Sequence, residues 1–181
     1  MRKEEVPSWE HNVRRLRDSD TTLTELSLSS VFVTHPAIGE DRWRELGEAL
    51  SDNSTLTSLY LWSCGITAAG AAHLAEGVGK SASLATLNLG NNLGNNLWSN
   101  KIGDSGAQVL GAALVATSTL TSLNLGICGI TAAGAAHLAE GVRQGPPRRV
   151  PLTLHGVDLG RVAAQVGLGD RRFQRLTVWI L

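Results

Sequence analysis

The most reactive side chains of this 181-residue chain come in matched pairs. Cys64 and Cys128 lie 64 residues apart, and His73 and His137 are separated by the same interval. Thiols and imidazoles that lie close together could form a disulfide or hold a metal ion. These four residues lack the short Cys/His spacing of a metal site, and no Ser/His/Asp arrangement accompanies them. We therefore predict no enzyme, no catalytic residue, no metal site and no cofactor.

A glycine-rich stretch at 77–81 resembles the end of a phosphate-binding loop. That motif requires a glycine five residues before Gly79, where Leu74 stands instead. The glycines would also end a helix instead of opening one, so we interpret them as a helix C-terminus. Asn53 begins an Asn-X-Ser/Thr glycosylation sequon, and we expect it in a turn between a helix and a strand.

Composition excludes several classes of protein. Sixteen basic side chains balance sixteen acidic ones, whereas a generic nucleic-acid binder carries a basic excess, so we expect no nucleic-acid partner. With 43% hydrophobic and 18% charged residues, the chain is too apolar to be disordered. No apolar run reaches the length of a membrane span, and the first residues do not resemble a secretion signal. We expect a cytoplasmic protein with no membrane partner.

The elements that must position these side chains form a repeat. The spacing Leu-x-x-Leu-x-Leu begins at residues 23, 56, 84 and 120, and two weaker copies begin at 149 and 173. Each triplet alternates inward and outward positions, as a short strand does. Helical apolar spacing follows at 68–78, 105–116 and 132–142. Units of under about 30 residues cannot bury their own apolar faces, so we expect them to stack with parallel strands.

Unequal unit lengths locate two insertions and a duplication. The first unit carries five extra residues around 31–36, and the third carries eight, in which 90–93 is repeated as 94–97. Residues 64–78 and 128–142 are identical over 15 positions. An identity of this length indicates duplication of a two-repeat block.

On these residues the chain resembles leucine-rich repeat proteins of the ribonuclease-inhibitor type, as in Ran GTPase-activating proteins and NOD-like receptors. The family pattern L-x-x-L-x-L-x-x-N/C-x-L/I matches 56–66 and 120–130, with Cys64 and Cys128 at the N/C position. In the third unit Asn92 and Asn100 both fit that position. The resemblance implies an α/β fold, a leucine-rich repeat solenoid (horseshoe) with parallel β-strands on the concave face and α-helices on the convex face.

The repeat also assigns structural roles to the paired residues. Cys64 and Cys128 lie two units apart, about 10 Å on strand spacing, which is beyond the reach of a disulfide. The resemblance implies that side chains at the N/C position face the loop interior and satisfy backbone groups there. His73 and His137 fall between core positions of their helices, so we expect them to face solvent.

We expect three regions along the chain: an N-terminal capping segment at 1–22, four clear leucine-rich repeats at 23–145 and degenerate C-terminal repeats at 146–181. A short helix at about 9–17 should cover the first unit. No comparable cap follows the last strand, and an uncovered strand edge favours pairing. Two interpretations stay open: the chain is a fragment of a longer array, or it self-associates through the C-terminal edge strand.

Residues between and just after the strand leucines should point outward on the concave face. Tyr60 and Trp62 project from one strand, and exposed aromatic side chains are typical binding anchors. Trp62 could equally lean into the loop and pack there, and Trp98 in the insertion is a further aromatic candidate. The predicted partner-binding residues are Glu25, Ser58, Tyr60, Trp62, Asn88, Trp98, Asn124, Arg175 and Trp179.

The sequence thus predicts a non-catalytic protein–protein interaction module that binds another protein on its concave face. The resemblance leaves two alternatives, a GTPase-activating regulator of the Ran GTPase-activating type and a recognition fragment of a NOD-like receptor. Charge is uneven along the array, with a net −3 over residues 21–50 and +5 over residues 143–181. An acidic surface on a partner should therefore meet the Arg-rich end.

Overall fold

Helices and strands alternate along the chain in a computed structural model that describes residues 8–28, 39–91, 99–147, 152–157 and 176–179. The elements in chain order are α1 (Trp9–Arg17), β1 (Glu25–Ser27), α2 (Glu40–Asp52), β2 (Ser58–Tyr60), α3 (Ala68–Lys80), β3 (Thr86–Asn88), α4 (Gly103–Ala116), β4 (Ser122–Asn124), α5 (Ala132–Gln144), β5 (Leu152–His155) and β6 (Leu176–Trp179). The predicted helices at 68–78, 105–116 and 132–142 are confirmed as α3, α4 and α5.

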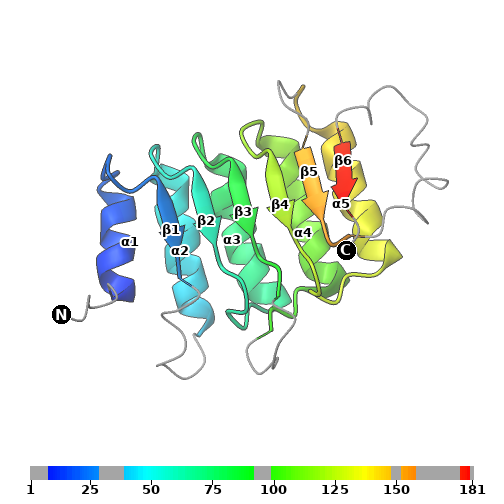
Figure 1. The fold of residues 1–181 in the computed structure, drawn as a ribbon, viewed down its shortest axis with the longest axis horizontal. Helices are drawn as coiled ribbons and strands as arrows, with labels where there is room; N and C mark the ends of the chain where they lie inside the picture. Colours follow the sequence, from blue (N-terminus) through cyan, green and yellow to red (C-terminus); the bar gives the residue numbers. More distant parts are fainter. Residues whose placement is uncertain (1–7, 29–38, 92–98, 148–151, 158–175, 180–181) are drawn as a thin grey trace.

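The six described strands form one parallel sheet in the order β1 to β6 (Figure 1). Figure 1 shows the helices behind one face of this sheet, while the other face is open. Helices need about 10 Å each and strands about 4.8 Å, so the strand side is the concave one. The predicted leucine-rich repeat solenoid, with strands on the concave face and helices on the convex face, is confirmed.

The core lies between the strands and the helices and runs the length of the array. The middle leucines of successive strands stand in register, at positions 26, 59, 87, 123 and 154. Ile66 and Leu74 approach this leucine ladder from the loop and from α3, and both are fully buried. Each unit therefore buries its apolar face against its neighbours, as the short repeat length requires.

The first unit is covered by α1, which has the bounds that the sequence predicted. Trp9 of α1 contacts Trp43 of α2 edge-on, with ring centroids 5.9 Å apart and planes at 85°. The indole N–H of Trp9 donates to the Glu45 carboxylate at 2.9 Å, and the Arg42 guanidinium lies 5.6 Å from the Trp9 ring centroid. These contacts fix the capping helix on the end of the core.

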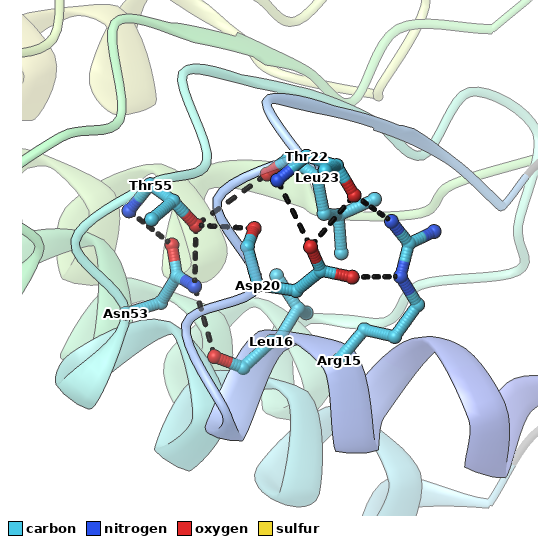
Figure 2. Close-up of polar contacts among 7 residues, drawn as sticks. All are labelled: Arg15, Leu16, Asp20, Thr22, Leu23, Asn53 and Thr55. Carbon is cyan, nitrogen blue, oxygen red and sulfur yellow. Dashed lines mark hydrogen bonds and ion pairs between the residues drawn. The ribbon is translucent and has the colours of Figure 1, made fainter.

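A polar seam joins this cap to the second unit (Figure 2). The Asn53 amide nitrogen donates to the Leu16 carbonyl at 2.8 Å, and its oxygen accepts the N–H groups of Thr55 and Leu56. Asn53 lies between α2 and β2, as predicted, and only 2% of its surface is exposed. The sequon asparagine is therefore a buried structural residue that holds the turn between helix and strand.

Glycine contacts bring the helices together in two close pairs. A Cβ at Gly77 of α3 would overlap the Gly47 carbonyl of α2, and a Cβ at Gly141 of α5 would overlap the Gly111 carbonyl of α4. Between α3 and α4, a Cβ at Gly79 would only reach ordinary contact, 3.6 Å from Ala113. The same close contact thus recurs at an offset of 64 residues, in keeping with the predicted two-repeat block.

Candidate functional site

Strand pairing places the outward residues of the sheet in two rows, which we call the concave rows. The first row runs through Glu25, Ser58, Thr86, Ser122, Thr153 and Thr177. The second runs through Ser27, Tyr60, Asn88, Asn124, His155 and Trp179. Neighbouring strands of a sheet lie about 4.8 Å apart, so successive residues of each row are closely spaced.

The concave rows are almost free of charge. Glu25 is the one acidic member and is exposed, and His155 is the one imidazole. The remaining members are hydroxyl, amide and aromatic residues. Such side chains donate and accept hydrogen bonds without the desolvation penalty of ions, so they suit a polypeptide surface better than a polyanion.

Tyr60 and Trp62 lie at the end of β2 and just after it. Both side chains are half-buried. The Trp62 carbonyl accepts a hydrogen bond from the Cys64 thiol at 3.5 Å, within the turn that follows β2. One part of the Trp62 side chain packs and the other faces solvent, so both interpretations of Trp62 stay predictions.

Asn88 and Asn124, two predicted contact residues, also shape the backbone. The side-chain oxygen of Asn88 accepts the Gly90 N–H at 3.0 Å, and that of Asn124 accepts the Gly126 N–H at 2.9 Å. Asn124 also leans over its neighbour, because a Cβ at Gly90 would lie 2.7 Å from the Asn124 oxygen. Sequence reasoning assigned these amides to a partner and missed their turn-forming hydrogen bonds.

The N/C position of the third unit is occupied by Asn100, whose side chain is 1% exposed. Its oxygen accepts the N–H groups of Cys64 at 3.0 Å and Ile66 at 2.9 Å. Its nitrogen donates to the carbonyls of Leu61 at 2.8 Å and Leu89 at 2.6 Å. The structure thus assigns this role to Asn100, while the alternative that the sequence left open, at position 92, lies outside the described residues.

Cys64 and Cys128 are buried and do not form a disulfide, as the strand spacing predicted. The Cys128 thiol donates to the carbonyl of Leu89 at 3.1 Å. Burial raises the pKa of Cys128 to about 12, so this thiol stays protonated at neutral pH and is a poor nucleophile.

With this geometry in view, comparison with known proteins identifies the family. A family model described as Leucine Rich repeat matches residues 52–75, 96–111 and 117–139. Ribonuclease inhibitor from Sus scrofa is 35% identical over 142 residues, which cover 77% of this chain and 29% of the inhibitor. The chain is a leucine-rich repeat protein of the ribonuclease-inhibitor type. It spans less than a third of the length of that relative.

Solved structures support the same fold for this leucine-rich repeat chain. The leiomodin-1 Actin-Binding Site 2 has a TM-score of 0.65 at 19% identity, covering 94% of this chain and 92% of that one. The tropomodulin C-terminal domain from Caenorhabditis elegans has a TM-score of 0.59 at 16% identity, covering 93% of this chain and 95% of that one. Leucine-rich repeats present extended concave surfaces and are a type of protein-interaction module.

The remaining reactive candidates of this repeat protein belong to its framework. Lys80 pairs with Glu76 at 2.8 Å, and the Ser81 hydroxyl accepts the Leu84 N–H. The helix ends within the stretch at 77–81 as predicted, but both glycines lie inside its last turn and the C-cap residue is Ser81. His137 is exposed as expected, whereas His73 is half-buried. Within the described ranges no three His, Cys, Asp or Glu residues gather as metal ligands, and no helix is long and apolar enough to cross a membrane.

The predicted contact residues are only partly placed. Glu25, Ser58, Tyr60, Asn88 and Asn124 stand in the concave rows, and Trp62 follows them. Trp98 and Arg175 lie outside the described residues, and Trp179 is placed only by its backbone register opposite His155.

Sequence reasoning also missed Ile127, which the structure leaves 51% exposed. A comparison of the two block copies could have found it. Residues 54–78 and 118–142 differ only at Tyr60/Asn124, Trp62/Gly126 and Ser63/Ile127. All three differences fall at the end of the strand and in the turn that follows, so the two copies diverge only in that strand end and turn.

Proposed function

We propose that this leucine-rich repeat chain is a non-catalytic interaction module that binds a partner protein along its concave rows. The observation that carries the proposal is the in-register run of mostly uncharged polar residues across the sheet, which includes Tyr60 at β2. Half-buried aromatic side chains offer large contact area at a low entropic penalty. The proposed setting is the cytoplasm, where cysteines such as Cys64 and Cys128 stay reduced.

Names of the matched proteins suggest the first partners to test. A relative called ribonuclease inhibitor makes a ribonuclease the first probe, and the structural match to an actin-binding site of leiomodin-1 makes actin the second. No observation on the described residues specifically supports GTPase activation or immune-receptor recognition.

The test replaces the aromatic pair with the residues that the second block copy uses at the same positions. The double variant Tyr60→Asn, Trp62→Gly should fold, because the same backbone carries Asn124 and Gly126 at β4. Val115→Ala on α4 is a matched control, since Val115 is 38% exposed on the opposite face. We expect the double variant to weaken partner binding by about 30-fold or more while the control binds normally.

Binding is measured by calorimetry with a ribonuclease and with actin, alongside thermal unfolding of each variant. If neither probe binds, proteins that the parent chain captures from a lysate and the double variant does not will identify the partner. The proposal is overturned if the double variant is as stable as the parent chain and still captures every protein that the parent chain captures.

A further inference from the structure

Ile127 adopts a backbone conformation that its side chain disfavours. Its φ is +59°, in the left-handed region that β-branched residues rarely enter. Its side chain is 51% exposed, so burial does not offset the strain. A strained residue that leaves an aliphatic side chain in water points to a role outside the fold.

The other block copy shows that folding does not require isoleucine here. Ser63 stands at the equivalent position and has a φ of +53°, so the left-handed turn belongs to the repeat itself. Serine fills that turn in the first copy without exposing an apolar group. The isoleucine therefore distinguishes the second copy by its chemistry and not by its backbone.

Beside Ile127 lies a shallow cavity of about 390 Å³, between the loops of the third and fourth units. Ser99 lines it, and the Ser99 hydroxyl is buried without a hydrogen-bond partner. Lys101 also lines it, is exposed, and forms no ion pair with any described residue. A buried hydroxyl without a partner is uncommon in folded proteins.

The walls of the cavity are held in place by hydrogen bonds. The Asn91 amide nitrogen donates to the carbonyls of Ile127 at 2.6 Å and Asn100 at 3.1 Å. The Gly103 N–H donates to the Cys128 carbonyl at 3.0 Å. Because these contacts join the two loops before any ligand arrives, binding would require little ordering of the protein.

We propose that this cavity, the Ile127 site, binds a protein segment in which an aliphatic side chain is adjacent to a carboxylate. Ile127 offers the apolar contact, while the exposed Lys101 ammonium offers a charged donor to the carboxylate oxygens. Lys101 is the one charged residue among the described residues that line the cavity, so an anionic group is favoured over a cationic one. None of the described residues that line the Ile127 site belongs to the concave rows, and the site adds a contact of different chemistry.

The test uses three synthetic hexapeptides: acetyl-GSLDSG-amide, its Leu-Asn counterpart and its Ser-Asp counterpart. We expect the Leu-Asp peptide to shift the amide NMR signals of residues 99–103 and 126–129 in the full chain, with a dissociation constant of about 1 mM. The two counterparts should bind at least about 5-fold more weakly, because each lacks one of the two contacts. Added salt should weaken binding of the two peptides that carry Asp and leave binding of the Leu-Asn peptide unchanged.

Ile127→Ser, which installs the residue of the first copy, separates binding from folding. We expect this variant to unfold at the same or a higher temperature and to bind the Leu-Asp peptide about 5-fold more weakly. Lys101→Gln should bring the Leu-Asp and Leu-Asn peptides to equal affinity. The double variant Tyr60→Asn, Trp62→Gly should still bind the peptide, so this site and the concave rows can fail independently.

The proposal is overturned if the parent chain shows no shifts at about 5 mM Leu-Asp peptide, or if the shifts map elsewhere. It is also overturned if Ile127→Ser binds as the parent does, or if that variant unfolds at a markedly lower temperature. The last result would make Ile127 a structural residue.

Discussion

The side-chain oxygen of Asn100 accepts the backbone N–H of Cys64 at 3.0 Å, inside the loops that leave β2 and β3. The same amide bonds backbone groups at 61, 66 and 89, so one side chain joins the second unit to the third. The Cys128 thiol of the fourth unit likewise donates to the Leu89 carbonyl of the third unit. Buried side chains at one repeat position thus satisfy the loop backbone of the unit before them.

Removal of the Asn100 amide should be among the most damaging single changes to stability. Asn100→Ala leaves buried N–H and C=O groups without partners, and we expect the free energy of unfolding to fall by about 3–5 kcal/mol. Asn100→Cys installs the residue found at 64 and 128, and we expect a smaller fall in the free energy of unfolding for this variant. Urea unfolding followed by circular dichroism measures both variants, and a loss below about 1 kcal/mol for Asn100→Ala would contradict the assigned role.

A methyl group at Gly77 should destabilise the protein, whereas one at Gly79 should not. A Cβ at Gly77 meets the Gly47 backbone, which cannot move without separating α2 from α3, so we expect Gly77→Ala to cost about 2–3 kcal/mol. Gly79→Ala, two residues along the same helix, meets Ala113 only at 3.6 Å and should be neutral or stabilise by up to about 1 kcal/mol. Equal unfolding midpoints for the two variants in urea would refute this account of helix packing.

Cys128 should resist thiol reagents in the folded protein. Burial raises its pKa from the ordinary 9.0 to about 12, so the unfolded chain releases this proton first as pH rises. Stability from this group is therefore complete below about pH 9 and is lost progressively between pH 9 and 12. Cys128→Ala should show a shallower decrease of unfolding temperature over this window, and rapid labelling of native Cys128 at neutral pH would count against burial.

Asp20 should contribute a component of stability that acid removes. Hydrogen bonds from Thr22 and Arg15 (Figure 2) lower the pKa of Asp20 from 3.8 to about 2. Because the folded pKa lies below the ordinary one, the contribution is present above about pH 4 and disappears as pH falls to 2. Asp20→Asn should therefore unfold at a lower temperature than the parent at neutral pH and at a similar temperature near pH 2. A difference that persists at pH 2 would mean that the carboxylate charge is not its source.

Local patterns were enough to predict the elements of this protein. The capping helix α1 lies at Trp9–Arg17 as expected, and α3 and α5 extend only two residues beyond their predicted ends. These predictions succeeded because each unit repeats the same spacing of leucines, and that spacing reflects burial within the unit and its nearest neighbours.

Predictions about single side chains depended on neighbours that no local pattern reveals. Asn88 and Asn124 were expected to contact a partner, yet each also accepts a backbone N–H two residues further on. Asn100 was one of two equivalent candidates until its four hydrogen bonds were seen. Ile127 was not singled out, since its strain and exposure exist only in the folded turn.

By itself, the sequence determined the repeat, the parallel order of its strands and the identity of the buried leucines, because apolar periodicity follows directly from the geometry of strands and helices. Only the tertiary structure decided which amide links two units, which glycines let helices touch, and that Ser99 and the exposed Ile127 line one cavity. Those features join residues that are about 30 or more positions apart in the chain, and their distances are set by stacking of complete units.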